Sequence, residues 1–325
     1  MNILSKIYIA GHTGLVGSAI FRKLEMQGYK NLIFQTSAQL DIRNQRAVND
    51  FFDQQKPEYV FLAAAKVGGI QANLSYRSAF IYDNLQIQTN VIQAAHFFRV
   101  KKLLFLGSSC LYPRLAAQPI RESELLTGAL EPSNEYYAIA KIAGIKLCQA
   151  YKLDFGCNFI TVMPPNLYGS NDHYDLETCH VLPALIRKIH EAKKQDIPTL
   201  SLWGSGTPRR EFLHIDDLSE ALLTLMLEYN EVSPINIGAS TDLSICQLAH
   251  LIKRIIGYKG DIQFDLTKAD GTPRKLLDSS KAIQFINWKP TISLENGIRE
   301  LYGSLEREKW YGMRLADGYP NKLPM

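Results

Sequence analysis

Two residues four positions apart carry the strongest chemical signal in this chain. Tyr137 and Lys141 follow the segment Gly107-Ser108-Ser109-Cys110, and residues at this spacing share one face of a helix. A lysine ammonium beside a phenol favours the phenolate and lowers the tyrosine pKa. Such a phenol can pass a proton to a carbonyl oxygen while hydride reaches the carbon. The pair therefore predicts carbonyl reduction; Tyr136, five positions before Lys141, faces elsewhere.

The spacing of this pair also has a plain explanation. The chain contains 16 tyrosines, so a lysine four positions after one of them is expected by chance about once. A solvated surface pair is the alternative. The neighbouring sequence is needed to distinguish a catalytic pair from a surface pair.

A glycine-rich turn lies close to the N-terminus. Gly11, Gly14 and Gly17 are spaced three apart, after the apolar run Lys6 to Ala10. Such glycines let the chain turn tightly, approach a pyrophosphate and pack a helix on a strand. The helix N-terminus then offers amide donors to the anion. Because the motif lies between a predicted strand and a predicted helix, it indicates a dinucleotide site; a purely structural turn is the alternative.

The end of the second predicted strand bears on the choice of cofactor. NAD-selective sites usually carry Asp or Glu there, on the ribose hydroxyls, but this chain has Gln35-Thr36-Ser37. No carboxylate repels a 2′-phosphate, so NADPH is allowed. No arginine attracts one either, so the preference over NADH stays open. Asp41 is the nearest acid, and a turn or a helix cap accounts for it.

Composition excludes several classes of protein. The 325 residues can build a large core, and the net charge of +4 is too small to indicate nucleic-acid binding but suits an anionic small molecule. Five scattered cysteines without metal-ligand spacing indicate reduced thiols and no metal site. No segment has the length and apolarity of a membrane span, and the short N-terminal apolar run reads as a strand. We expect a cytoplasmic protein that binds neither nucleic acid nor membrane.

Strand and helix patterns alternate through the first half. This order predicts an α/β fold with a doubly wound parallel (Rossmann) sheet, covered on both faces. The expected strands are residues 7–10, 32–35, 59–64, 102–106 and 158–163. The expected helices are residues 14–27, 44–54, 85–98 and 136–152.

The second half is less regular and predicts a smaller mixed α/β C-terminal lobe. We expect a loop over 166–176, helices over 180–191 and 218–228, strands over 199–203 and 235–238, and a turn over 204–208. The tail 311–325 contains glycine and two prolines and is expected to be only partly ordered. The predicted domains are a Rossmann domain of residues 1–168 plus 212–240 and a substrate lobe of residues 169–211 plus 241–325.

Taken together, the glycine turn, Ser108 and the Tyr137/Lys141 pair resemble the extended short-chain dehydrogenase/reductase family. Within it, the chain is most similar to the 3,5-epimerase-4-reductases that act on GDP-4-keto-6-deoxy-D-mannose. The similarity runs from residue 9 to about residue 278. It rests on residues 63–70, 106–110, 137–146, 163–169, 203–208, 210–214 and 270–275.

The resemblance implies two kinds of chemistry in one site. The C4 ketone acidifies the protons on C3 and C5; a base removes each proton, and an acid returns one on the opposite face. NADPH then delivers hydride to C4, which gives GDP-L-fucose. Both stages place negative charge on the ketone oxygen, so fixed donors assist both. By family position Ser108 and Tyr137 are those donors, and Lys141 holds the nicotinamide ribose.

The family pattern also supplies the base and the acid, Cys110 and His180. A thiol needs nearby positive charge to become a useful thiolate, and histidine titrates near neutrality. Without the family pattern Cys110 would be a buried inert thiol and His180 a residue at a helix start. We assign Cys179 to packing.

Binding positions follow from the same resemblance. NADP(H) is expected to contact Gly11, Thr13, Gly14, Leu15, Val16, Gly17, Ser37, Ala64, Leu106, Gly107, Lys141, Pro164, Asn166, Leu167 and His180. The substrate is expected to contact Lys188, Trp203, Arg210 and Lys275, since two phosphates need cationic donors.

Three of these positions depart from the family pattern, which often has arginine at Thr13, Ser37 and Lys188. The first two would touch the adenosine phosphate, so selectivity for NADPH over NADH is weakened; Lys188 keeps the charge but not the fork. By analogy with the family, a homodimer through the helices near 85–98 and 136–152 is expected.

Two other functions compete with this interpretation. A sugar-nucleotide 4-epimerase, reductase or 4,6-dehydratase could use the same fold. A dehydratase, however, needs an Asp-Glu pair where this chain has Ser109-Cys110, and a plain 4-epimerase needs no Cys110/His180 pair. A non-catalytic NADP-sensing protein is the second competitor, and such proteins typically lose the Tyr/Lys pair that is intact here.

Overall fold

A six-stranded parallel sheet forms the centre of the larger part of the molecule. The computed structural model describes residues 1–268 and 270–308. The strand order is β2-β1-β3-β4-β5-β9, so the predicted doubly wound parallel sheet is confirmed. The strands are β1 (Ile7–Ala10), β2 (Leu32–Ile33), β3 (Tyr59–Leu62), β4 (Lys102–Leu106), β5 (Phe159–Met163) and β9 (Ile235–Asn236).

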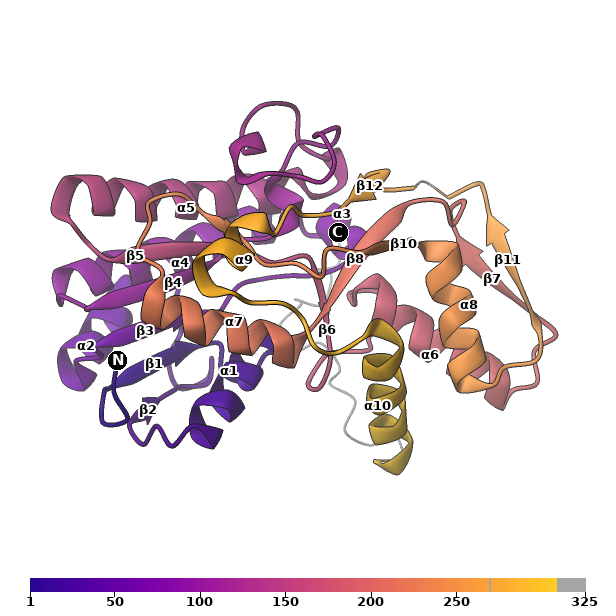
Figure 1. Cartoon of the computed structure of the whole chain (residues 1–325), viewed down its shortest axis with the longest axis horizontal. Helices are drawn as coiled ribbons and strands as arrows, with labels where there is room; N and C mark the ends of the chain where they lie inside the picture. Colours follow the sequence, from indigo (N-terminus) through magenta and orange to yellow (C-terminus); the bar gives the residue numbers. More distant parts are fainter. Residues whose placement is uncertain (269, 309–325) are drawn as a thin grey trace, which may run out of the picture.

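Helices cover both faces of this sheet (Figure 1). Successive residues of a strand point to opposite faces, and β4 illustrates the result. Leu103 and Phe105 join the core under one set of helices, and Leu104 and Leu106 join the core on the other face. The first set is α2 (Gln45–Gln55), α4 (Arg77–Phe97) and α5 (Glu135–Phe155); the second is α1 (Leu15–Met26), α7 (Ile215–Glu228) and α9 (Ser280–Ile286).

A second group of elements lies beyond the carboxyl ends of the central strands, on the right of Figure 1. Strand β8 is central to it: β10 and β12 pair with it, and β6 pairs with it as well. A separate β7-β11 pair and three helices enclose a third core. The elements are β6 (Asn166–Tyr168), α6 (Val181–Lys194), β7 (Thr199–Trp203), β8 (Arg209–His214), β10 (Asp242–Ser244), α8 (Ile245–Ile256), β11 (Asp261–Asp265), β12 (Arg274–Lys275) and α10 (Leu294–Arg307).

Several predicted elements are wrong in detail. The predicted loop 166–176 contains β6, and neither β8 nor the short helix α3 (Ile70–Ser75) was predicted. The helix expected from residue 85 begins at Arg77, and β2 ends two residues before the predicted position. β2 and β6, of two and three residues, carry too little alternation to read, and β8 begins with three charged residues instead of an apolar pattern. The tail 311–325, with the end of the predicted substrate lobe, lies outside the described residues. The domain boundaries remain a prediction.

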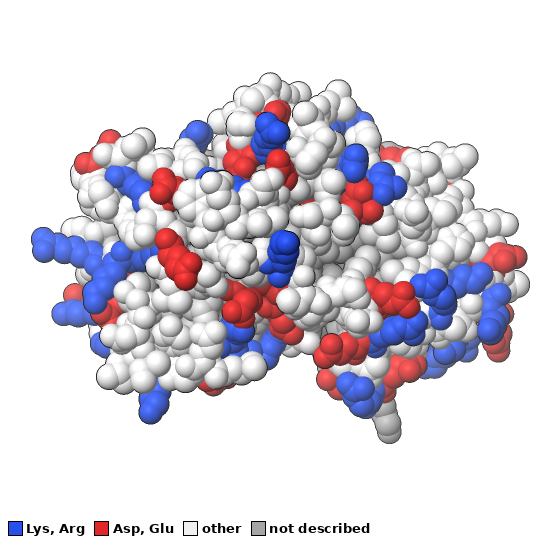
Figure 2. All heavy atoms as spheres, in the orientation of Figure 1, with Lys and Arg blue, Asp and Glu red and all other residues white. Residues whose placement is uncertain are grey.

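Charged side chains of both signs are interspersed over the face shown in Figure 2. No continuous basic band crosses that face, in keeping with the small net charge. Within the described part of the chain, no helix is long and apolar enough to cross a membrane. The same residues contain no cluster of three or more His, Cys, Asp or Glu side chains that could hold a metal ion.

Candidate active site

The glycine turn after β1 forms one wall of the site at the carboxyl end of the sheet. Gly11 has a positive φ of 86°, and a Cβ there would approach the Ala64 backbone nitrogen to 2.8 Å. A Cβ on Gly17 would lie 2.0 Å from the Gly11 oxygen. Both glycines are therefore needed by the protein's own packing. Gly14 differs, because its Cβ would make only an ordinary contact at 3.4 Å.

Gly14 is also the N-cap of α1, and this suits an anionic ligand. No side chain caps the helix there, and its first turn carries no acidic residue. The helix therefore presents backbone N–H groups and the positive end of its dipole at an uncrowded glycine. Thr13, Leu15 and Val16 belong to the same turn. The residues present thus fit the pyrophosphate of a dinucleotide.

The other predicted cofactor positions lie on segments that end at the same edge. Ala64 follows β3 and lies against Gly11. Leu106 ends β4, and Gly107 allows β4 to approach β5, since a Cβ there would meet the Met163 sulfur at 2.5 Å. The remaining members are Pro164 after β5, Asn166 and Leu167 on β6, and Ser37 in an exposed turn after β2.

Ser108 and Tyr137 meet where β4 ends and α5 begins. Ser108 caps the short helix η1 (Ser109–Leu111), and its hydroxyl accepts a hydrogen bond from the Cys110 N–H at 3.2 Å. The Tyr137 ring packs edge-on against Phe80, with 6.3 Å between the ring centroids. Burial raises the pKa of Tyr137, and Cys110 raises it further, although a hydrogen bond with Ser108 opposes the shift. The phenol therefore keeps its proton and can donate it.

The expected effect of Lys141 on Tyr137 is wrong. Burial lowers the pKa of Lys141 to about 7, and this lysine is not among the groups that shift the Tyr137 pKa. The Lys141 ammonium lies 4.2 Å from the centre of the Phe105 ring. A spacing of four residues fixes a shared helix face but not the positions of the side-chain ends. Because both groups are buried, desolvation raises the pKa of Tyr137 and lowers that of Lys141.

Cys110 faces two cations from the second group of elements. The Lys275 ammonium donates a hydrogen bond to the Cys110 sulfur at 3.3 Å, and Lys275 itself is only 9% exposed. Burial raises the pKa of the Cys110 thiol, but Lys275, the Ser108 hydroxyl and Arg210 lower it, and the net pKa lies below the ordinary value. The predicted base thus has the positive environment that a thiolate requires.

His180 is the N-cap of α6. Burial lowers its pKa; Asp172 opposes the shift, and His173 and Lys275 add to it. The segment before it is fixed by a close approach to Gly69, whose N–H donates to the Thr178 carbonyl at 2.8 Å. A Cβ on Gly69 would lie 2.5 Å from the Cys179 oxygen.

Cys179, beside His180, contrasts with Cys110. It is buried, and burial raises the pKa of its thiol to about 12. This environment suits the packing role predicted for Cys179 and leaves it without nucleophilic character.

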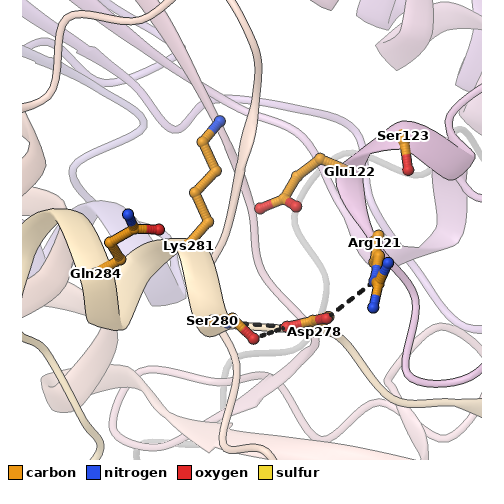
Figure 3. Close-up of a pocket in the computed structure, with 7 residues that line it drawn as sticks. All are labelled: Arg121, Glu122, Ser123, Asp278, Ser280, Lys281 and Gln284. Atoms are coloured by element: carbon orange, nitrogen blue, oxygen red, sulfur yellow. Dashed lines mark hydrogen bonds and ion pairs between the residues drawn. The ribbon is translucent and has the colours of Figure 1, made fainter.

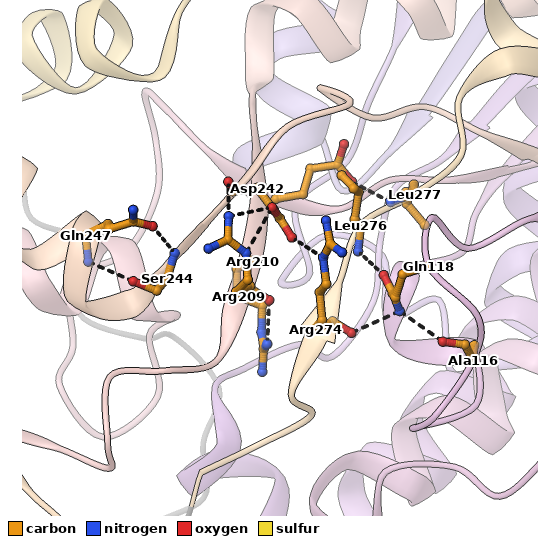
Figure 4. A network of polar contacts seen from close by, with 11 residues as sticks. Ala116, Gln118, Arg209, Arg210, Asp242, Ser244, Gln247, Arg274, Leu276 and Leu277 are labelled. Atoms are coloured by element: carbon orange, nitrogen blue, oxygen red, sulfur yellow. Dashed lines mark hydrogen bonds and ion pairs between the residues drawn. The ribbon is translucent and has the colours of Figure 1, made fainter.

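Alternation along β8 and β12 sorts their basic residues. Arg209 and Arg274 both pair with Asp242, at 2.8 Å and 2.6 Å, as Figure 4 shows. Arg210 and Lys275, one residue further along each strand, are register partners and face Cys110. The structure therefore separates the two predicted binding residues from their neighbours in sequence.

The last two predicted substrate positions lie together elsewhere in the second group of elements. The Lys188 ammonium lies 5.4 Å from the centre of the Trp203 ring, close enough for a cation–π contact. Trp203 is 59% exposed, so much of this ring is available to a ligand. Lys188 is thus more than a solvated surface charge.

Sequence reasoning missed Glu211 and Gln118, which hold the strand that carries Lys275. Glu211 is fully buried, and its carboxylate accepts backbone N–H groups of Ser240 at 2.7 Å and Leu277 at 2.9 Å. Burial raises the pKa of Glu211 to about 7, although backbone donors oppose the shift. Glu211 follows two arginines in β8, so its charge gave no signal that it would be buried.

A separate polar pocket of about 360 Å³ lies between η2 (Glu122–Glu124) and α9. An ion pair between Arg121 and Asp278 crosses it (Figure 3). None of the predicted site residues lines this pocket, so it is not part of the candidate active site.

Comparisons with known proteins agree with this geometry. Residues 7–238 match the model of the NAD dependent epimerase/dehydratase family. The chain is 55% identical over 298 residues to GDP-L-fucose synthase 1 of Arabidopsis thaliana, covering 92% of each. It is 51% identical over 306 residues to the GDP-L-fucose synthase of Escherichia coli (strain K12), covering 91% of this chain and 95% of that one.

A solved structure extends the agreement to the whole fold. The GDP-L-fucose synthetase from Naegleria fowleri bound to NADP superposes with a TM-score of 0.87 at 29% identity, covering 95% of this chain and 96% of that one. The family match and the two relatives each span most of the chain. The chain therefore belongs to the NAD dependent epimerase/dehydratase family, in the group of the GDP-L-fucose synthases.

Proposed function

We propose that this chain is a bifunctional NADPH-dependent 3,5-epimerase and 4-reductase that converts GDP-4-keto-6-deoxy-D-mannose to GDP-L-fucose. One observation carries the proposal: a thiol with a lowered pKa, Cys110, shares a site with Ser108 and Tyr137. A reductase needs the hydroxyl pair, whereas only an epimerase needs a base beside it. The names of the relatives support the same reaction.

In this proposal the glycine turn and the N-terminus of α1 hold the pyrophosphate of NADP(H). When bound, the cofactor supplies hydride to C4 of the sugar. Lys141 binds the nicotinamide ribose, and Asn166, Leu167 and His180 lie near the nicotinamide. Thr13 and Ser37 are close to the adenosine phosphate; neither is an arginine, so the 2′-phosphate is held less tightly than an arginine would hold it.

The proton chemistry is assigned to four side chains. The Cys110 thiolate removes a proton from C3 or C5, and the electron pair moves onto the ketone oxygen. Ser108 and Tyr137 donate hydrogen bonds to that oxygen as its charge grows. His180 then returns a proton to carbon on the opposite face. In the reduction, Tyr137 gives its own proton to the C4 oxygen.

Substrate binding is assigned to Arg210, Lys275, Lys188 and Trp203. Arg210 offers a guanidinium fork to a diphosphate. Lys188 and Trp203 form one cation–π unit, on which a base or a sugar can rest.

Coupled turnover tests the function directly. Purified protein is given GDP-4-keto-6-deoxy-D-mannose and NADPH, and absorbance at the reduced nicotinamide band is followed while the sugar product is identified by NMR. Consumption of NADPH with formation of GDP-L-fucose is the expected result. Protein that carries its own tightly bound NAD and leaves NADPH unchanged would instead be a 4-epimerase. Tyr137→Phe with unaltered turnover would refute the catalytic assignment, and no turnover of any kind would favour a sensing protein.

We also propose a cytoplasmic homodimer that pairs through α4 and α5. These helices expose Tyr82, Tyr136, Ile139, Leu153 and Phe155; burying such side chains against a second copy removes apolar area from water. All five cysteines are free, which suits a reducing compartment. Light scattering gives the mass in solution, and Leu153→Glu is expected to convert a dimer into a monomer.

A further inference from the structure

Lys275 has an unusual partner for a buried lysine. Its ammonium contacts the Cys110 sulfur at 3.3 Å across 165 positions of sequence. Within residues 1–268 and 270–308, no ion pair joins Lys275 to a carboxylate. At the neighbouring register position, Arg209 and Arg274 both form ion pairs with Asp242. The charge of Lys275 is therefore directed at the thiol.

The backbone around Lys275 is held on two sides (Figure 4). The side-chain amide of Gln118 donates to the Arg274 carbonyl at 3.2 Å and accepts from the Leu276 N–H at 2.9 Å. On the other side, β8 pairs with β12, and Glu211 accepts the Leu277 N–H. These contacts fix the lysine before any ligand arrives, which is what electrostatic assistance requires.

Within the described residues, the charged and titratable groups around Cys110 come from several elements. Arg210 reaches it from β8 and adds positive charge, and the Tyr137 phenol faces it from α5. Lys275 also lowers the pKa of His180, the N-cap of α6. Glu131 and Asp270 act on Arg210.

Two other thiols show what burial does where a nearby cation only partly opposes it, Lys141 for Cys148 and Arg187 for Cys179. Burial raises the pKa of Cys148 and of Cys179. For Cys110 the same penalty is outweighed. The difference lies in the cations that β8 and β12 bring to Cys110.

We propose that Lys275 acts on the catalytic base itself, holding Cys110 as the thiolate that removes the C3 and C5 protons. This inference rests on the proposed function and deepens it. In each step the thiolate takes the carbon's proton and becomes a thiol, while the electron pair of the C–H bond moves onto the ketone oxygen. Lys275 keeps its own proton throughout. Its positive charge stabilises the Cys110 thiolate before the step. After the step the sulfur is a neutral thiol, and this charge pairing is lost.

The test measures thiolate formation without substrate or cofactor. Iodoacetamide alkylation of the Cys110 peptide is followed by mass spectrometry between pH 5.5 and 9.5, with the Cys246 peptide as an internal reference. In Lys275→Met the midpoint of the Cys110 profile is expected to rise by about one to two pH units. Lys275→Arg keeps the charge and is expected to keep most of the lowered midpoint. Lys275→Gln is a second uncharged variant in case the Met side chain disturbs folding.

Lys102→Met is the matched control. Lys102 is also a buried lysine, 3% exposed, but its ammonium donates to the Leu225 carbonyl at 2.9 Å, at the opposite end of the sheet from Cys110. Its substitution also removes a hydrogen bond made by a buried lysine, but outside the site. The alkylation profile of Cys110 in Lys102→Met is expected to match that of the wild-type protein. An unchanged midpoint in both uncharged Lys275 variants would overturn the proposal.

A second readout separates this role from simple substrate binding. In D₂O, solvent deuterium enters C3 and C5 of GDP-4-keto-6-deoxy-D-mannose. In Lys275→Met the rate of this exchange is expected to fall at pH 7 and to recover as the pH passes the new midpoint of the Cys110 thiol. Loss of ground-state binding alone would raise KM without that recovery, and would count against the proposal. The remaining outcome is that the wild-type protein shows no deuterium exchange while Lys275→Met still raises the Cys110 alkylation midpoint. In that case the proposed function fails and the Lys275–Cys110 coupling stands.

Discussion

The two halves of the site use buried lysines in opposite ways. On the hydride side, Lys141 follows Tyr137 by one helical turn, lies over Phe105, and has its pKa lowered to about 7 by burial. On the proton-transfer side, Lys275 arrives from a distant strand and donates to Cys110. The first lysine lies one turn from a phenol whose pKa burial raises, and the second lowers the pKa of a thiol. Proximity in sequence was therefore a poor guide to electrostatic coupling.

Removing the phenol is expected to separate the two halves most sharply. Tyr137→Phe should reduce the rate of NADPH-dependent reduction by about 10²–10⁴-fold, because the proton donor is lost. Deuterium exchange at C3 and C5 should fall less, since Ser108 still donates to the ketone oxygen. Stopped-flow absorbance and NMR measure the two rates on one preparation. Equal losses in both would show that the halves are not separable.

Cys110→Ser tests the proton-transfer half of the site. We expect exchange at C3 and C5 to fall by at least about 10²-fold, because a serine hydroxyl is a far weaker base than a thiolate. Affinity for NADPH, measured by fluorescence titration, should be unchanged because Cys110 is not a predicted cofactor contact. Cys246→Ser, at a cysteine outside the site, is the matched control. Exchange at the normal rate in Cys110→Ser would refute its role as the base.

Glu211, on the strand that pairs with the Lys275 strand, should make the stability of the protein depend on pH. The folded-state pKa of Glu211 is raised to about 7, above its ordinary value near 4.5. Stabilisation from its protonated form is thus present below about pH 4.5 and is lost as the pH rises to about 7. We expect the free energy of unfolding in urea to fall by on the order of 2 kcal/mol over this range.

Glu211→Gln provides the control for that titration. The variant should be less stable at every pH, because one of its two terminal atoms can no longer accept a backbone N–H. It should nevertheless lack the fall in stability between pH 4.5 and 7. A fall of equal size in the variant would mean that other groups cause it.

The smallest expected effect concerns the cofactor half alone. Ser37→Arg places a guanidinium in the exposed turn after β2, where we propose that the adenosine phosphate binds. The preference for NADPH over NADH, as the ratio of their kcat/KM values, should rise by roughly tenfold. Deuterium exchange without added cofactor should not change. A preference that stays constant would place the 2′-phosphate away from this turn.

The glycine turn of the cofactor half could be predicted from the sequence because its requirements are local, whereas the other cofactor contacts came from the family resemblance and remain a prediction. Gly11 and Gly17 serve a turn within seven residues, and the strands and helices around them show clear periodicity. The sheet and its two helical layers followed from the same pattern. Lys141 shows the limit of this approach, since the spacing gave the correct face but the wrong electrostatic effect.

The proton-transfer half could be predicted only through family resemblance. Cys110, His180 and Lys275 lie on three separate segments: η1, the N-cap of α6 and β12. β12 has only two residues, and β8, which pairs with it, is rich in charge. Glu211 and Gln118 escaped notice because their roles depend on backbone groups far along the chain. Nothing in a local pattern indicates that Arg210 faces the site while Arg209 pairs with Asp242.

The 165-residue separation between Cys110 and Lys275 has a consequence for synthesis. A ribosome completes the glycine turn, Ser108 and the Tyr137/Lys141 helix long before it adds the lysine. Until then the thiol lacks its principal activating cation. A nascent chain therefore carries its future base without the charge of Lys275, which reaches Cys110 only when β12 pairs with β8.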